Sequence, residues 1–281
     1  MLNRQFALGG IGAAAGLAVV LALSAGSAWF RSEPVEIESE ADEALPLPPV
    51  PPRIAEGADY ERCLGMLNAD PLGARTFAEA WLATGGGEGA QHCSALAVIA
   101  LGEPDTGAEA LDRLAGKSRA AAAARAAVYG QAGQAWMMAG APDRALGSTT
   151  LALSMTPDDS DLLIDRSIAS GTLERYQDAV DDLTHALDLD PRRADALVFR
   201  AAAWRHLNRL DLAQDDVDRA FVLDPEDADA LLERGILRQR RGDRAGARTD
   251  WEHAIELSPD SATGDLAQQN LALLDAGPDR R

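Results

Sequence analysis

The 281-residue sequence predicts an all-α fold, a right-handed α-solenoid of helix-turn-helix repeats with an N-terminal membrane or signal helix. Four prolines support the solenoid because they recur with a strict 34-residue period, at Pro157, Pro191, Pro225 and Pro259. A fixed period of this length is typical of stacked helical hairpins. Such arrays present binding surfaces more often than catalytic pockets, so the period also ranks the classes of function.

Two columns of alanine share this period. One lies twelve residues before each proline and the other five before it: Ala145, Ala179, Ala213 and Ala247, then Ala152, Ala186, Ala220 and Ala254. Because the columns are seven residues apart, both lie on one face of the second helix of each unit. Small side chains there allow the paired helix to approach closely. The proline then ends the unit, since it has no amide proton and clashes with the preceding turn.

These columns resemble the motif of the tetratricopeptide repeat family, which has small residues at these positions and a proline at the end of each unit. Aligned in this way, the four units run over 126–159, 160–193, 194–227 and 228–261. The aromatic residue that the family has late in the first helix is present as Trp136 and Trp204, but is Ser170 and Arg238 in the other units. The resemblance implies an array of paired helices that binds proteins.

A charged pair recurs with the same period. Arginines on the first helix are followed sixteen residues later by aspartates on the second, giving Arg166 and Asp182, Arg200 and Asp216, and Arg234 and Asp250. In the first unit both positions change together, to Ala132 and Ser148. This joint change predicts a hydrogen-bonded bridge inside each of the last three units, with a structural role. The alternative is two independently solvated charges.

The N-terminal region predicts export. Residues 1–31 contain an uncharged run, Phe6 to Phe30, which is long enough for the roughly 20 residues of a membrane span. Small residues before Trp29 also fit signal cleavage, so a signal peptide and a single transmembrane anchor both remain open. Either one places the body on the periplasmic side of a bacterial inner membrane, anchored or secreted. Residues 32–58 form an acidic, proline-rich linker, interpreted as a spacer or a docking site for a polyproline-binding partner.

Residues 59–121 predict a helical cap with a degenerate repeat. Its two cysteines, Cys63 and Cys93, are the only ones in the chain, and an even count in an exported protein indicates a disulfide. The four repeats then occupy 122–261. Residues 262–281 predict a C-terminal capping helix and tail, because terminal units of such arrays need a covered edge.

The composition excludes several classes of function. The formal net charge of −19 argues against nucleic-acid binding, which needs a cationic surface. The same charge leaves the N-terminal segment as the only expected membrane contact. The sequence has no nucleophile elbow, no phosphate-binding glycine loop and no spacing of metal ligands. We therefore expect no enzyme activity, no cofactor and no metal.

The resemblance also implies where a partner binds, since in this family the first helices line an inner groove. Carried over to this chain, the groove residues are Gln134, Met137, Ile164, Ile168, Val198, Arg205, His206, Leu232, Ile236 and Arg240. A mixed apolar groove with basic residues in the later repeats suits an extended or helical protein segment. Ile164, Val198 and Leu232 have the alternative role of packing neighbouring repeats.

The predicted function is a non-enzymatic adaptor that faces the periplasm and binds a partner protein in this groove. The first alternative is a structural subunit of a cell-envelope assembly, held through repeat faces or the cap. The second is an enzyme whose site has no recognisable motif. The partner, the process and the oligomeric state are not specified by the sequence.

Overall fold

The computed structural model describes residues 53–277. The predicted signal or anchor segment and most of the linker lie outside this range. Within it the chain forms thirteen α-helices and no strand, as the all-α prediction requires. None of these helices has both the length and the apolar character needed to cross a membrane.

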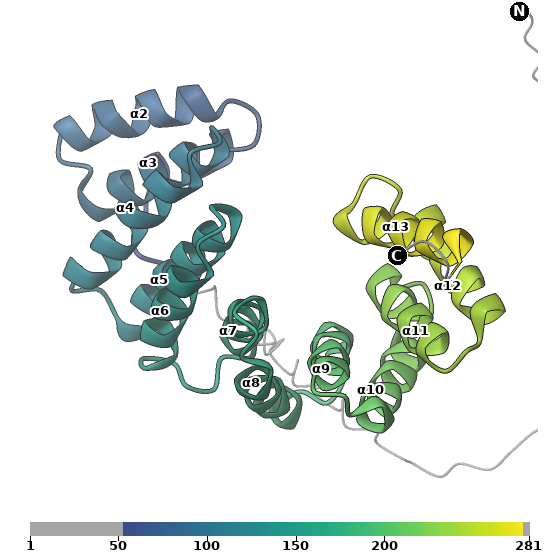
Figure 1. Ribbon diagram of the computed structural model, residues 1–281. Helices are drawn as coiled ribbons and strands as arrows, with labels where there is room; N and C mark the ends of the chain where they lie inside the picture. Colours follow the sequence, from purple (N-terminus) through teal and green to yellow (C-terminus); the bar gives the residue numbers. More distant parts are fainter. Residues whose placement is uncertain (1–52, 278–281) are drawn as a thin grey trace, which may run out of the picture. The chain divides into compact units, whose positions relative to one another are not determined.

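The helices follow one another in antiparallel pairs (Figure 1). The cap contains α1 (Ala58–Met66), α2 (Pro71–Ala83), α3 (Gly87–Ala100) and α4 (Pro104–Lys117). The repeats contain α5 (Ala122–Met138), α6 (Pro142–Leu153), α7 (Ser160–Thr172), α8 (Tyr176–Leu189), α9 (Ala194–His206), α10 (Leu210–Leu223), α11 (Ala228–Arg240) and α12 (Arg244–Leu257). The last helix is α13 (Ala262–Ala276).

The repeat helices form two layers. The first helices of the units, α5, α7, α9 and α11, each contact the next first helix along the array. The second helices, α6, α8, α10 and α12, pack between consecutive first helices on the other side. This arrangement is the one that the two alanine columns predict, because all eight alanines are buried at the contact between the layers.

The 34-residue period extends beyond the four units. Helix α13 begins one full period after α11, so it occupies the place of the first helix of a further unit. It packs on both α11 and α12, and Ala267 and Leu274 are buried there. The C-terminal helix therefore covers the last hairpin as a half-repeat.

The cap joins the array with a different spacing. The separation between the starts of α4 and α6 exceeds the 34-residue period by one helical turn, and α5 has 17 residues where α7, α9 and α11 have 13. The additional turn at the start of α5 therefore accounts for the loss of register. Gly107 takes the place of the first alanine of the column, and a Cβ there would lie 2.8 Å from the carbonyl oxygen of Ala95. Only glycine fits so close an approach of α3 and α4.

Candidate binding groove

Each of the three predicted Arg–Asp pairs is present as a two-bond bridge between the helices of one hairpin. Arg166 donates from Nε and Nη2 to the two carboxylate oxygens of Asp182, at 2.8 and 2.6 Å. Arg200 and Asp216 form the same bridge at 2.8 and 2.8 Å, and Arg234 and Asp250 at 3.0 and 2.7 Å. The charges are thus paired rather than independently solvated, and bidentate geometry fixes the two helices of a unit relative to each other.

In the first unit, which lacks the Arg–Asp pair, a carboxylate from the cap connects the helices instead. Asp112 of α4 accepts hydrogen bonds from Ser148 Oγ at 2.7 Å and from Trp136 Nε1 at 2.8 Å. The carboxylate thus comes from the preceding hairpin and connects the cap to both helices of the first unit. The sequence analysis missed Asp112 because α4, in the cap, is out of register with the 34-residue period of the repeats.

The cap itself is held by the predicted disulfide between Cys63 and Cys93, which joins α1 to α3. Beside it, His92 accepts a hydrogen bond from the Tyr60 hydroxyl at 2.6 Å, and its Nε2 lies 2.6 Å from the side-chain oxygen of Gln131 in α5. Burial lowers the pKa of His92 and raises the pKa of Tyr60 to about 12, so both are neutral at pH 7. The network fixes the cap on the array without carrying charge.

The layer of first helices contains two adjacent cavities. One, of about 190 Å³, lies between α5 and α7 and is lined by Gly133, Gln134, Met137, Asp165 and Ile168. The other, of about 260 Å³, is lined mainly by apolar residues of α7, α8 and α9, including Ile168, Phe199 and Ala202. Ile168 forms a wall of both cavities. Two apolar cavities that share a wall suit side chains from one bound segment.

A carboxylate faces the smaller cavity. Gln134 donates from Nε2 to Asp165 at 2.9 Å, which joins α5 to α7. Burial, with the neighbouring charges of Asp161 and Asp159, raises the pKa of Asp165, although the Gln134 hydrogen bond acts in the opposite direction. Asp165 therefore keeps its proton to a higher pH than an exposed aspartate does, and its carboxyl group offers a hydrogen-bonding partner beside the cavity.

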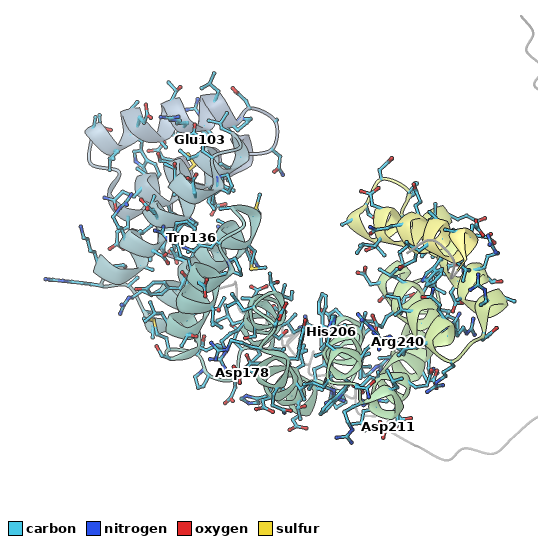
Figure 2. All side chains as sticks on the ribbon, viewed as in Figure 1. Glu103, Trp136, Asp178, His206, Asp211 and Arg240 are labelled. Carbon is cyan, nitrogen blue, oxygen red and sulfur yellow. A yellow bond between two sulfur atoms is a disulfide. The ribbon has the colours of Figure 1, made fainter. Side chains whose placement is uncertain are left out.

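The predicted basic part of the groove is largely neutralised. Arg205 donates from Nε to Glu233 at 2.5 Å, and the two side chains are only 13% and 6% exposed. This pair joins α9 to α11. Burial raises the pKa of Glu233, opposed by Arg205 and Arg240. Arg205 thus serves an interhelix ion pair, whereas Arg240 at the end of α11 remains exposed (Figure 2).

His206, at the end of α9, borders the larger cavity. Its ring stacks on Tyr176 of α8, with the centroids 4.3 Å apart and the planes 10° apart. Burial and the charges of Arg205 and Arg240 lower the pKa of His206, so the ring is neutral at pH 7. The stacked rings form an uncharged aromatic border of the cavity, which a bound side chain would contact.

The other predicted groove residues divide by burial. Ile164 and Val198 are buried in the core between repeats, as the packing alternative expects. Met137, Ile168, Leu232 and Ile236 are half-buried, and Gln134 is exposed. Two further groups were missed by sequence reasoning. One is Tyr176, on a second helix, and the other is the column Asp165, Phe199 and Glu233, whose 34-residue spacing was visible but whose chemistry differs in every unit.

Metal ligands do not gather in the described residues, where no cluster of three or more histidine, cysteine, aspartate or glutamate side chains could hold an ion. The groove therefore offers shape, apolar contact and a few hydrogen-bonding groups. These are the components of a recognition surface.

Comparisons by sequence find no relative: no family model and no curated protein matches this chain. Solved structures do match. The pilF protein of Pseudomonas aeruginosa is 18% identical, with a TM-score of 0.59 over 76% of this chain and 96% of its own. A chain of the Cut9–Hcn1 hetero-tetramer of the APC/C is 18% identical, with a TM-score of 0.58 over 76% of this chain but only 42% of that one.

A third match carries the repeat in its description. TTC0263 of Thermus thermophilus, a thermophilic TPR protein, is 18% identical, with a TM-score of 0.53 over 66% of this chain and 98% of its own. At such identities the likeness concerns the fold alone. Together with the 34-residue columns and the paired helices, it shows that the described part of this chain has the fold of a tetratricopeptide-repeat solenoid.

Proposed function

We propose that this protein is a non-enzymatic adaptor on the periplasmic side of a bacterial inner membrane, and that it binds a segment of a partner protein in the groove of first helices. The observation that carries the proposal is the pair of adjacent cavities with Ile168 as their common wall. Two side chains of a single segment would occupy them, one from each side of this residue.

The chemistry of the groove favours an apolar segment with few charges. The larger cavity is lined by apolar side chains, and its neighbouring histidine is neutral at pH 7. Arg205 is engaged by Glu233, which leaves Arg240 as the exposed cation of the predicted basic set. An acidic peptide would therefore find one arginine rather than a basic cluster, and electrostatic attraction would contribute little.

The compartment is part of the proposal. A disulfide between Cys63 and Cys93 persists in an oxidising environment such as the periplasm and is rare in the cytosol. The uncharged run in residues 1–31 provides the route of export. Thiol labelling of the denatured protein tests this directly. Two blocked cysteines on protein from growing cells support export, and two free thiols contradict it.

The groove is tested by crosslinking in the native envelope followed by identification of the captured protein. Ala202→Ile narrows the larger cavity. The fold should tolerate this change, because the equivalent positions of the neighbouring units, Ile168 and Ile236, are already isoleucine. Ala245→Ile, at an exposed position of the second helix α12, is the matched control. We expect the groove variant to lose capture and the control to keep it. Equal capture by both would refute the groove assignment.

One observation favours the structural-subunit alternative. In α13, Leu266 and Leu273 are seven residues apart, on one helix face, and are 49% and 62% exposed. An exposed leucine pair on the terminal helix is suited to a permanent contact with another subunit. Changing both to glutamate and measuring the mass of the native assembly by light scattering tests this role. A smaller assembly supports it, and an unchanged mass contradicts it.

A further inference from the structure

The column that carries the family's aromatic residue keeps tryptophan in two of the four units. It contains Trp136, Ser170, Trp204 and Arg238, at the 34-residue spacing of the repeat. Trp136 and Trp204 pack between their own hairpin and the preceding one. Arg238 instead makes an ion pair with Asp250 at 2.8 Å. Ser170 is too small to fill the space.

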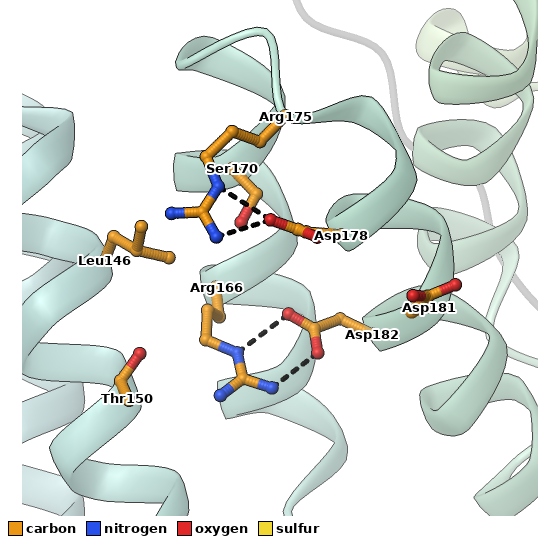
Figure 3. Close-up of a pocket in the computed structure, with 8 residues that line it drawn as sticks. All are labelled: Leu146, Thr150, Arg166, Ser170, Arg175, Asp178, Asp181 and Asp182. Atoms are coloured by element: carbon orange, nitrogen blue, oxygen red, sulfur yellow. Dashed lines mark hydrogen bonds and ion pairs between the residues drawn. The ribbon is translucent and has the colours of Figure 1, made fainter. Parts of the chain in front are cut away.

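A cavity of about 350 Å³ lies at this position in the second unit (Figure 3). Leu146 and Thr150 of α6 form one wall, and Arg166 and Ser170 of α7 face them. Arg175 closes one side. The cavity shares no lining residue with the two groove cavities, so it is a separate feature of the surface.

Two residues of one wall have counterparts beside the tryptophans of other units, one in the third unit and one in the first. Leu146 is the equivalent of Val180, which belongs to the buried cluster against which Trp204 packs. Thr150 is the ninth residue of its helix, as is Asp112, the residue that accepts the Trp136 indole N–H at 2.8 Å. Leu146 therefore offers an apolar side chain to the ring, and Thr150 offers a hydroxyl oxygen to its N–H group. The rest of the lining is mostly charged, with Asp181 and the paired side chains of Arg166 with Asp182 and of Arg175 with Asp178.

The arginine beside the cavity completes the match. Arg175 is the equivalent of Arg209, whose guanidinium lies 5.8 Å from the centre of the Trp204 ring. In the first unit the cation comes from another position, Arg144, which lies 4.4 Å from the centre of the Trp136 ring. A cation next to the face of an indole attracts it through the ring's quadrupole. Arg175 has this position but no aromatic partner within its own hairpin.

We infer that the cavity binds an indole ring, presented as a tryptophan side chain by a segment of a partner protein. The floor is closed, because Ser170 and Asp182 are buried, whereas Thr150, Arg175 and Asp178 at the rim are exposed. Arg175 donates from Nε to Asp178 at 2.6 Å, which holds its guanidinium at the rim. The ring enters from solvent, and the charged rim supplies hydrogen-bonding partners for the backbone of the segment that carries it. This site is independent of the groove and would hold a second part of a partner.

The test uses the full-length chain with 5-fluoroindole as the probe and fluorine NMR as the readout. We expect saturable binding to the wild type and complete loss in Ser170→Trp, which places the repeat's own ring in the cavity. Trp204→Ser creates the equivalent cavity in the next unit and should raise the stoichiometry from one site to two. Circular dichroism checks the folding of each variant. If Ser170→Trp does not fold, Leu146→Trp fills the cavity from the opposite wall and should also abolish binding.

A second arm decides how the ring is presented. The peptides acetyl-Gly-Trp-Gly-amide and acetyl-Gly-Leu-Gly-amide are compared as competitors of the probe. Displacement by the tryptophan peptide alone supports a protein-borne ring. Probe binding without displacement by either peptide overturns that part, because the cavity would then accept only a free indole. No saturable binding, or binding that survives in folded Ser170→Trp, overturns the site itself.

Discussion

The bridge between Arg200 and Asp216 offers the sharpest test of how the hairpins are held together. Its side chains are 14% and 5% exposed, and it closes through two hydrogen bonds of 2.8 Å. Arg200 also donates from Nη1 to Thr184 of α8 at 3.1 Å, which extends the bridge to the preceding unit. The first unit shows the alternative that the fold tolerates at the same two positions, an alanine and a serine.

Arg200→Ala should be costly because it leaves a buried carboxylate. Breaking a buried ion pair by removing one partner typically costs about 3–5 kcal/mol. Here Arg219 lies 3.4 Å from the same carboxylate, so we expect a cost at or just below the lower end of that range, about 2–3 kcal/mol. The double variant Arg200→Ala, Asp216→Ser copies the first unit and removes the unpaired charge. Its serine faces Thr184, the equivalent of Asp112, and should cost about 1 kcal/mol less than the arginine change alone.

The assay is a double-mutant cycle measured by urea denaturation, with hydrogen exchange of the α9 and α10 amides as a local readout. Repeat arrays can unfold in parts, so the local readout guards against a global fit that averages over units. The reasoning is refuted if the effects of Arg200→Ala and of Asp216→Ser alone simply add up to that of the double variant, because the charges would then not interact. It is also refuted if the double variant is less stable than Arg200→Ala.

Three further predictions follow from the cap, the groove and the core. Replacing Cys63 and Cys93 by alanine should lower the free energy of unfolding by about 3–4 kcal/mol, because the bond closes a loop with a sequence separation of 30. Urea denaturation of the oxidised wild type and of the alanine variant measures this loss, and an equal midpoint for the two proteins would contradict it. Asp165 has a pKa raised above its ordinary 3.8, so it contributes stability that is present below pH 3.8 and is lost as the pH rises through the folded pKa. Asp165→Asn should therefore raise the melting temperature at pH 7 but not at pH 3, and a gain of equal size at both would show that charge is not the cause. Gly235→Ala places a Cβ 2.3 Å from Nε1 of the fully buried Trp251. Although alanine favours helices, we expect this clash to lower the free energy of unfolding, measured by urea denaturation, by about 1–3 kcal/mol. A stabilised variant would show that the indole moves freely.

Periodicity accounts for how much of the fold was predictable. In a strict 34-residue repeat, the four residues of a column occupy the same structural position in four units. The alanine columns therefore identify the buried face of the second helices, and the prolines identify where each unit ends. The Arg–Asp bridges were predictable for the same reason, because their joint change in the first unit reveals that the two positions depend on each other. At α5 the register shifts by one helical turn, so residues of the cap no longer align with the columns of the repeats. The role of Asp112 could not be predicted for this reason.

The groove was less predictable because its chemistry is not periodic. The column of Asp165, Phe199 and Glu233 contains a hydrogen-bonded acid, an aromatic ring and an ion-pair partner. Each depends on what lies across the layer, which a single sequence does not report. Arg205 illustrates this point, since its position in the motif suggests a free cation and only the structure shows Glu233 beside it. The groove residues remain a prediction until a partner is captured.

Departures from the repeat can be judged by whether a neighbour compensates for them. In the first unit, which lacks the arginine, Asp112 compensates by accepting hydrogen bonds from both Ser148 and Trp136. The missing aromatic of the fourth unit is answered by an ion pair between Arg238 and Asp250. Ser170 leaves an open cavity, although Leu146 and Arg175 keep the residue types that receive a ring in the other units. The first unit also has a cavity beside Trp136, lined by Asp112, Arg144 and Ser148, so an opening at this position is not by itself a sign of a missing ring. We assign the cavity at Ser170 to a ligand because Leu146 and Arg175 correspond to Val180 and Arg209, the residues that receive Trp204 in the third unit.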